Sequence, residues 1–188
     1  MGAGSMHSLR GHFLVASPHL PDRNFCRTVV LMVQHDQNGA LGLVLNRPTA
    51  NTVGQLWETV TKESCACERL VNHGGPVQGP LMALHTEASW ADDEVLPGVY
   101  FASRSEYLEN IVRQNERPFR LFVGYAGWAG GQLESELEAG GWLTTKATRE
   151  DVFSDDDDLW RTMAQRIGSE ILGLAVKPKH IPQDPSRN

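Results

Sequence analysis

The chain has 188 residues, 40% of them hydrophobic, and a formal net charge of −6. This length suits one ordinary domain with a real core, and the longest aliphatic run, residues 29–33, is far shorter than the roughly 20 apolar residues of a membrane span. We therefore expect a cytoplasmic protein without membrane contact, in which residues 1–10 form a flexible start, residues 11–176 a single domain and residues 177–188 a loose tail.

The negative charge is concentrated in residues 134–158, which carry nine acids against Lys146 and Arg149. Proteins that bind nucleic acid through its phosphates usually show a basic stripe instead. The predicted helices are also separated by strands, unlike the short turn of a helix-turn-helix. Both observations argue against direct nucleic-acid binding. The acidic run 155–158 is better explained by a helix start, whose dipole favours carboxylates, than by a cation site.

Three cysteines, Cys26, Cys65 and Cys67, predict no disulfide framework. Cys65 and Cys67 are separated by a single residue, whereas zinc-binding pairs leave about two to four, so we place them unpaired in a surface loop. The seven histidines form neither an H-E-x-x-H pair nor a Cys/His cluster. The sequence therefore predicts no metal and no cofactor.

Residues 28–45 predict a β-hairpin, because two apolar runs flank Asn38-Gly39, a dipeptide that supplies the positive φ angles of a tight turn. Pro48 ends the second strand. Thr52 and Gln55 then form a capping box, which begins an amphipathic helix with apolar residues at 53, 56, 57 and 60. A polar loop follows this helix.

In the middle of the chain, short strands lead into a second helix. Ser103 with Glu106 forms another capping box, which starts a helix over residues 104–115. Upstream, Gly74-Gly75-Pro76 breaks the chain into separate strands. These strands are predicted at residues 70–73, 80–85 and 99–102.

The last third of the chain is organised around a strand, a glycine turn and a helix. Residues 119–125 alternate as a strand, and residues 127–131 are expected to form the glycine turn. After this turn we expect a helix from Gln132 that Gly140-Gly141 stops, a strand over residues 142–145, and a final helix capped by Ser154 and Asp157 with Leu159, Trp160, Met163 and Ile167 on its apolar face.

The glycine turn is a natural place to look for a ligand, because free N–H groups at a helix start bind anions. Its glycines do not follow G-x-G-x-x-G, however, and it lacks the lysine of a P-loop. His73-Gly74-Gly75-Pro76 is similar to an esterase oxyanion loop, but no G-x-S-x-G nucleophile elbow occurs. A close-packed turn held by Tyr125 and Trp128 is therefore preferred to a nucleotide site, and no catalytic residue is predicted.

Four segments together resemble the AlgH/YqgE family: GHFLVASPHLPDRNFCRTVV, Asn46-Arg47-Pro48, Gly74-Gly75-Pro76-Val77 and GYAGWAGGQLESEL. The resemblance implies a mixed α/β (α+β) fold, in which a bifurcated, largely antiparallel sheet curls into a partly closed pseudo-barrel with flanking helices. Members of this family are labelled transcriptional regulators. The resemblance brings no established reaction, cofactor or catalytic residue.

The family positions supply the candidate binding residues. Side chains with directional hydrogen bonds and two arginines that could hold an anion occur among them, beside turn-forming glycines. Alternatively, the same groups satisfy buried backbone atoms around the turns. The candidate set is Arg27, Asn46, Arg47, Gly74, Gly75, Tyr125, Trp128, Gln132 and Glu134.

We therefore expect a non-enzymatic regulatory protein that binds a small anionic ligand or a protein partner near the glycine turns. One alternative is an uncharacterised enzyme that uses Glu134 or a histidine as its acid-base group, with the glycine turn stabilising an anion. Direct regulation through DNA ranks third. Its test would be the salt dependence of binding, which is steep wherever phosphate contacts dominate.

Overall fold

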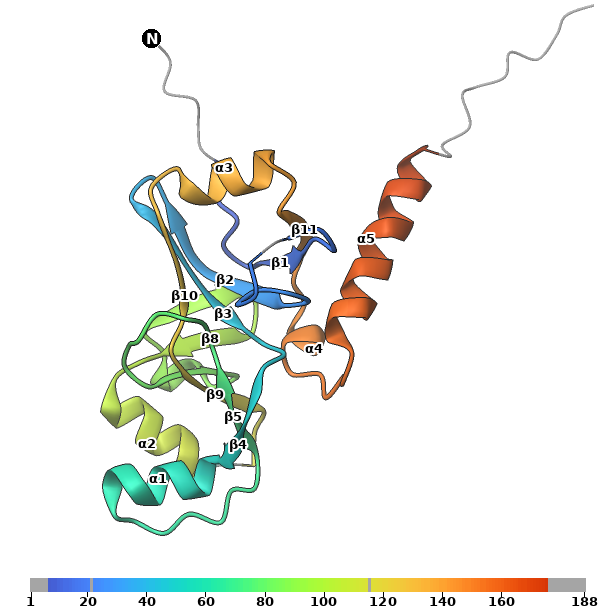
Figure 1. Ribbon diagram of the computed structural model, residues 1–188. Helices are drawn as coiled ribbons and strands as arrows, with labels where there is room; N and C mark the ends of the chain where they lie inside the picture. Colours follow the sequence, from blue (N-terminus) through green and yellow to red (C-terminus); the bar gives the residue numbers. More distant parts are fainter. Residues whose placement is uncertain (1–6, 21, 115, 176–188) are drawn as a thin grey trace, which may run out of the picture.

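The computed structural model describes residues 7–20, 22–114 and 116–175 (Figure 1). Two β-sheets and a set of helices make up this part of the chain, which confirms the mixed α+β class. Every strand pairing is antiparallel except that of β5 with β9, so the largely antiparallel character is also confirmed. Both sheets are open: within the described residues, neither one closes into a barrel.

The first sheet has five strands in the order β10-β3-β2-β1-β11. Its centre is the predicted hairpin of β2 and β3, which carries an irregularity in register between Met32 and Gln34. The hairpin turns at Gln37-Asn38, one residue earlier than predicted, because Gly39 already pairs with Asp36. Its strands are β1 (His12–Ala16), β2 (Val29–Asp36), β3 (Gly39–Val44), β10 (Ala126–Ala129) and β11 (Trp142–Lys146).

The second sheet has six strands in the order β4-β5-β9-β6-β8-β7. The parallel pair β5 and β9 sets Asn72 opposite Phe122, near the middle of this sheet. Its strands are β4 (Pro48–Thr52), β5 (Leu70–His73), β6 (Met82–His85), β7 (Asp93–Leu96), β8 (Val99–Ala102) and β9 (Phe119–Val123).

Helices cover the sheets from three sides (Figure 1). The first two α-helices lie together at one end of the molecule and α3 lies at the other, while α5 runs along the side and extends past it. None of the described helices combines the length and apolar character that crossing a membrane requires. The helices are α1 (Val53–Thr61), the short 3₁₀ turn η1 (Ala88–Trp90), α2 (Ser105–Arg113), α3 (Gln132–Glu138), α4 (Arg149–Val152) and α5 (Leu159–Ala175).

The chain passes from one sheet to the other after β3 and again after β9, and Gly74 bonds to the last residue of each of these strands. The N–H of Gly74 donates to Val123 O at 2.9 Å, and its carbonyl accepts from Val44 N at 2.9 Å. A Cβ at Gly74 would lie 2.3 Å from Gly124 O, so only glycine allows this close crossing. Gly124, at φ 73°, turns the chain from β9 into β10. The bifurcation of the sheet is therefore a backbone junction built on glycines.

The core divides along the alternating faces of the strands. Phe122 of β9 belongs to the inner cluster shared by both sheets, α4 and α5, whereas its neighbour Leu121 packs against α1 and α2. A third cluster joins α3 to the outer face of the first sheet. Arg120 lies on the same inner face as Phe122, so its side chain is directed into the space between the second sheet and the loop before α5.

Several predicted elements are confirmed. They include the Thr52–Gln55 capping box, the strands at residues 70–73 and 99–102, and the helix that begins at Gln132. The first six residues and residues 176–188, which include the predicted tail, lie outside the described part of the chain. Gly11, the first residue of the predicted domain, is bonded to the first sheet, because its N–H donates to Met32 O at 2.9 Å.

Other predictions are wrong for local reasons. Residues 126–129 are not part of a glycine turn, because they pair with β3 as strand β10, and the turn is confined to Gly130-Gly131. Ser103 does not cap α2, because its hydroxyl and its backbone N–H both bond to Asp92. Cys67 is buried against α1 instead of lying on the surface.

The cap of the final helix is also displaced from its predicted position. This helix begins at Leu159, and Asp158 accepts the backbone N–H of Arg161 at 3.3 Å. The hydroxyl of Ser154 instead accepts from Asp156 N at 3.0 Å, within the loop that precedes the helix. Residues 155–157 are therefore loop residues, and of their carboxylates only that of Asp156 accepts hydrogen bonds within the described chain.

Candidate functional site

Three of the predicted site residues form a clamp of backbone hydrogen bonds. Asn46 Oδ1 accepts from Val29 N at 2.9 Å, and its Nδ2 donates to Arg27 O at 2.8 Å. The Arg47 guanidinium donates to the carbonyls of Asn46 and Cys26, and the Arg27 side chain stacks over Trp160. In this conformation the Asn46 amide and Arg47 are engaged in holding the loop before β2.

Trp128 and Gln132 are joined by a residue that the sequence analysis did not select. Glu136 Oε2 accepts from Trp128 Nε1 at 3.0 Å and from Trp142 Nε1 at 2.8 Å, while its Oε1 accepts from Gln132 Nε2 at 3.0 Å. Gln132 Oε1 accepts the backbone N–H of Ala129 at 3.1 Å. This network fastens α3 to the first sheet, and the four-residue spacing from Gln132 to Glu136 is its signal in the sequence.

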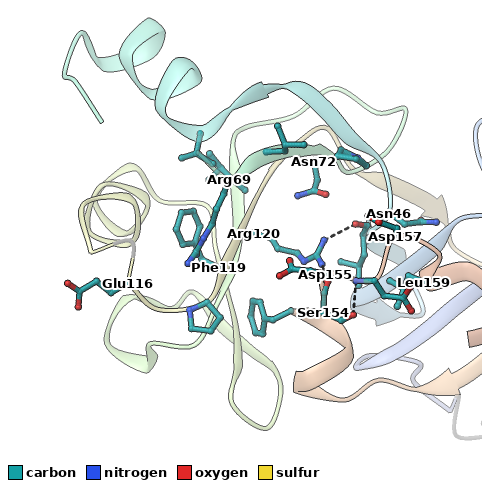
Figure 2. A pocket seen from close by; sticks show the side chains of 18 residues that line it. Asn46, Arg69, Asn72, Glu116, Phe119, Arg120, Ser154, Asp155, Asp157 and Leu159 are labelled. Carbon is teal, nitrogen blue, oxygen red and sulfur yellow. Dashed lines mark hydrogen bonds between the residues drawn. The ribbon is translucent and has the colours of Figure 1, made fainter. Parts of the chain in front are cut away.

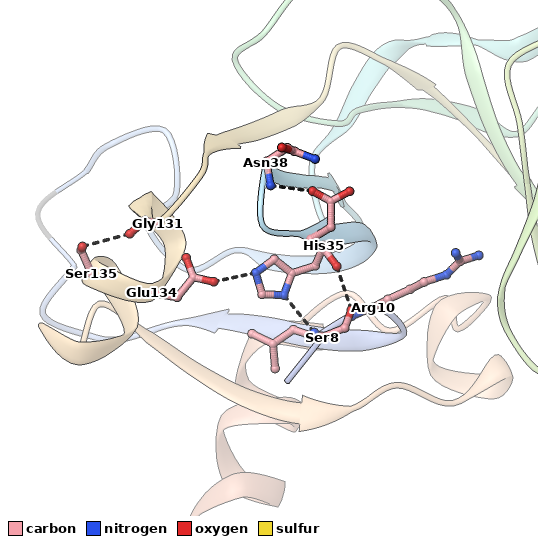
Figure 3. Close-up of polar contacts among 9 residues, drawn as sticks. Ser8, Arg10, His35, Asn38, Gly131, Glu134 and Ser135 are labelled. Atoms are coloured by element: carbon pink, nitrogen blue, oxygen red, sulfur yellow. Dashed lines mark hydrogen bonds and ion pairs between the residues drawn. The ribbon is translucent and has the colours of Figure 1, made fainter. Parts of the chain in front are cut away.

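Glu134 pairs with His35 at 2.9 Å, and the His35 side chain is only 3% exposed (Figure 3). The backbone N–H of Leu9 donates to His35 Nδ1 at 3.0 Å, which places the ring proton on Nε2, facing the carboxylate. Ser8 Oγ also donates to the His35 carbonyl at 2.9 Å. Both ring nitrogens are occupied, so His35 of β2 joins the segment before β1 to α3.

The predicted site residues thus divide into separate groups. Gly74 and Gly75 form the crossing, and Tyr125 packs beside it against Gly79 and Gly127. An open groove along β3 and β10 is lined in part by Tyr125 and Trp128. The other predicted side chains lie elsewhere, at the clamp or on α3.

The cavity with unengaged polar groups lies between the second sheet and the loop before α5 (Figure 2). Its volume is about 550 Å³, within the range of small-molecule sites, roughly 300–1,000 Å³. Arg120 of β9 and Asn72 of β5 point into it from the sheet, because both occupy the inner face. Leu45, Phe153 and Leu159 supply apolar wall.

Arg120 is a half-buried cation whose guanidinium bonds to backbone carbonyls within the described chain. Nη1 donates to Leu45 O at 2.9 Å and Nη2 donates to Ser154 O, so part of its five N–H groups remains free. No ion pair joins Arg120 to any acid in the described part of the chain. Burial lowers the pKa of its guanidinium, and the charge of Asp155 partly opposes that effect.

Asn72 is the second unengaged group. The residue is 5% exposed, yet its side-chain amide has no hydrogen-bond partner among the residues that the structure describes. The amide is reached from the cavity, because the fully buried side-chain atoms without a partner in the described chain are His85 Nε2 and Asp92 Oδ1, so it is available to a ligand there. The amide faces the same cavity as the Arg120 guanidinium (Figure 2).

The rim of the cavity is acidic. Asp155 and Asp157 are exposed and make no side-chain hydrogen bond within the described chain, and Glu116 lies across the opening. Asp156 serves the loop instead: its carboxylate accepts from Thr162 Oγ1 at 2.6 Å and from Asp158 N at 2.9 Å, and these bonds lower its pKa. Arg69 is the cation at this rim, stacked on Phe119.

Sequence reasoning missed Arg120 and Asn72 as site residues, although each has a signal. Arg120 alternates with apolar residues in its strand, on the face of Phe122, and Asn72 interrupts a short apolar strand. In the described residues, no cluster of three histidine, cysteine, aspartate or glutamate side chains could hold a metal ion.

The comparison with known proteins concerns nearly the whole chain. The sequence pattern described as AlgH-like matches residues 13–172. The chain belongs to the AlgH-like family. Family relatives include a UPF0301 protein of Stenotrophomonas maltophilia, 37% identical over 93% of this chain and 97% of its own, and one of Chlorobaculum tepidum, 35% identical over 90% and 92%.

Solved structures of similar proteins agree with the fold. The solution structure of the AlgH protein from Pseudomonas aeruginosa superposes with a TM-score of 0.72 at 32% identity, covering 96% of this chain and all of that one. A crystal structure of the Corynebacterium diphtheriae protein DIP2367 gives a TM-score of 0.70 at 25% identity, covering 85% and 87%. The names of these relatives and solved structures state no reaction and no ligand.

Proposed function

We propose that this AlgH-like protein is a non-enzymatic binding protein that holds a small anionic ligand in the cavity between β5, β9 and the loop before α5. One observation carries the proposal: the half-buried Arg120 guanidinium, which forms no ion pair within the described chain, and the amide of Asn72, a 5% exposed residue without a side-chain partner among the described residues, face the same cavity. Arg120 and Asn72 are the binding residues of this proposal, in place of Arg27 and Arg47.

The energetic reason is the cost of both groups in the ligand-free protein. Partial burial disfavours the charge of Arg120, and the Asn72 amide lacks the hydrogen bonds that a protein partner would supply. A carboxylate or similar anion would accept from the free N–H groups of Arg120 and from the Asn72 amide in charge-assisted hydrogen bonds, which are stronger than neutral ones. The ligand would thus supply the hydrogen-bond partners that the described chain does not provide for these two groups.

The proposed regulatory character follows from the walls of the cavity. One wall belongs to the second sheet, and the other is the loop that leads into α5, whose exposed Ile171 and Leu172 extend beyond the body of the fold. A ligand that contacts both walls would stabilise one position of the loop and hence of α5. We propose this coupling for a cytoplasmic regulator that responds to the ligand.

The enzyme alternative has one observation in its favour, the 2.9 Å contact between His35 and Glu134. In this contact, however, both ring nitrogens have partners within the fold, so an acid-base role would require the segment before β1 to detach from His35. Direct DNA binding has less support, because the cavity rim and residues 155–158 are acidic.

The proposal is tested by calorimetric titration of the full-length protein with a panel of small carboxylates and inorganic phosphate. We expect at least one anion to bind with an affinity that falls at least tenfold in Asn72→Leu. Asn51→Leu, at an exposed position of β4 outside the cavity, is the matched control and should bind as the unmodified protein does. Equal affinities in all three proteins would contradict the proposed site.

A further inference from the structure

Charges of opposite sign line the same cavity. Arg120 and Asn72 form an inner subsite for an anion, and Asp155 is the carboxylate whose charge acts on Arg120. Asp155 and Asp157 nevertheless make no hydrogen bond or ion pair with any described residue. An anionic ligand at Arg120 would therefore sit close to unpaired carboxylates at the rim.

Such a rim discriminates between classes of anion. A phosphate ester or a simple carboxylic acid is attracted by the charge of Arg120 but repelled by the carboxylates of Asp155 and Asp157. A ligand that also carries an ammonium group a few ångströms from its carboxylate gains at both places, because the ammonium can donate to the rim carboxylates. Only a zwitterion satisfies the inner and the outer subsites together.

From this arrangement we infer that the cavity binds a free α-amino acid with an apolar side chain, through its carboxylate at Arg120 and Asn72 and its ammonium at Asp155 and Asp157. The inference rests on the function proposed above and narrows its ligand class. In an α-amino acid a single carbon separates the two charges, which suits the neighbouring subsites. Leu45, Phe153 and Leu159 form a wall that an apolar side chain would contact.

The competing explanation is that Asp155 is only a loose partner of Arg120. In that case Asp155 would only reduce the positive potential at Arg120, and any bound acid would compete with the Asp155 carboxylate for that cation. The two explanations differ in what removal of the Asp155 carboxylate does. For an amino-acid site, Asp155→Asn weakens amino-acid binding, whereas for a charge screen it strengthens the binding of every acid.

The test is titration of the full-length protein with leucine, methionine and phenylalanine, each compared with its deaminated acid and its decarboxylated amine. We expect at least one amino acid to bind at least tenfold more tightly than either analogue. The paired substitution Asp155→Asn with Asp157→Asn should remove about that factor for the amino acid and leave or improve the affinity for the deaminated acid.

Asp158→Asn is the matched control, since it removes the same charge from the same loop at a residue that does not line the cavity, and asparagine also caps helices well. This variant should bind as the unmodified protein does.

Two results would overturn the inference in distinguishable ways. In the first, deaminated acids bind as tightly as the amino acids, and the Asp155→Asn and Asp157→Asn variant keeps its affinity for the amino acids. This result would leave the anion site in place and contradict the amino-acid assignment. If no amino acid binds at millimolar concentration, the assignment is likewise wrong. If no acid or inorganic phosphate binds either, the proposed function fails with it.

Discussion

Two asparagines line the same cavity, and replacing each by leucine should change stability in opposite directions. Asn72 has no hydrogen-bond partner for its side chain within the described chain, although the residue is 5% exposed. Asn46 bonds the backbone at both ends of its amide, to Val29 N at 2.9 Å and Arg27 O at 2.8 Å. Leucine has nearly the same shape as asparagine but no polar atoms.

The magnitudes follow from those partners. Asn72→Leu replaces an amide that has no partner in the described chain but is reached from the cavity, so the full penalty of about 1–3 kcal/mol for a sealed, unpaired group does not apply. We expect a gain of about 1 kcal/mol or less. Asn46→Leu leaves the N–H of fully buried Val29 without a partner, and should cost about 2–3 kcal/mol.

The assay is urea unfolding of both variants and the unmodified protein, with thermal unfolding as a second measurement. For a chain of this size one kcal/mol corresponds to about 2–4 °C in Tm. We therefore expect Asn72→Leu to raise the Tm by a few degrees and Asn46→Leu to lower it by more. If Asn72→Leu lost more than about 1 kcal/mol, the amide would have a structural partner and the reasoning for the binding site would fail.

The other predictions concern the α3 network, the crossing and a buried histidine. Glu136→Ala should cost about 3 kcal/mol and alter tryptophan fluorescence, because two indole N–H groups lose a charged acceptor; exposed Glu138→Ala is the control, and equal unfolding midpoints would refute it. Gly124→Ala should cost at least about 2 kcal/mol in urea unfolding, since φ is 73° and the Cβ would lie 2.6 Å from Gly75 O; a neutral result would contradict the crossing geometry. Burial lowers the pKa of His85 to about 4, below the 6.5 of an unfolded chain, so the unfolded state binds the proton more readily. His85 should therefore reduce stability as pH falls from about 6.5 to 4, by no more than about 1.4 kcal/mol per pH unit, and His85→Gln should flatten that slope; an unchanged slope would refute the assignment.

Local signals in the sequence predicted much of the secondary structure. The hairpin and the capping box of α1 were both predicted, because they depend on residues close together in the chain. The hairpin turn itself lies one residue before the expected Asn38-Gly39, at Gln37-Asn38. Strand β10 was missed because Gly127 and Gly130 resemble a turn, whereas pairing with β3 stabilises an extended strand. Tertiary pairing here overrides the local preference of glycine.

The candidate site was less accessible to sequence reasoning. The glycines at residues 74 and 75 were predicted as part of a binding site, but their first role is the close crossing of two strands. Asn72 and Arg120 are 48 positions apart, and they share a cavity because β5 and β9 pair in parallel and the loop before α5, which contacts Arg120 through Ser154 O, forms the facing wall. No local pattern encodes that juxtaposition.

The most direct test of the central claim is the side-chain amide signal of Asn72 in a ¹H–¹⁵N spectrum, assigned by its disappearance in Asn72→Leu. We expect this signal to shift progressively as a bound carboxylate ligand is added, and to saturate at the ligand's calorimetric Kd. A ligand that saturates the protein while the Asn72 amide signal stays in place would contradict the account.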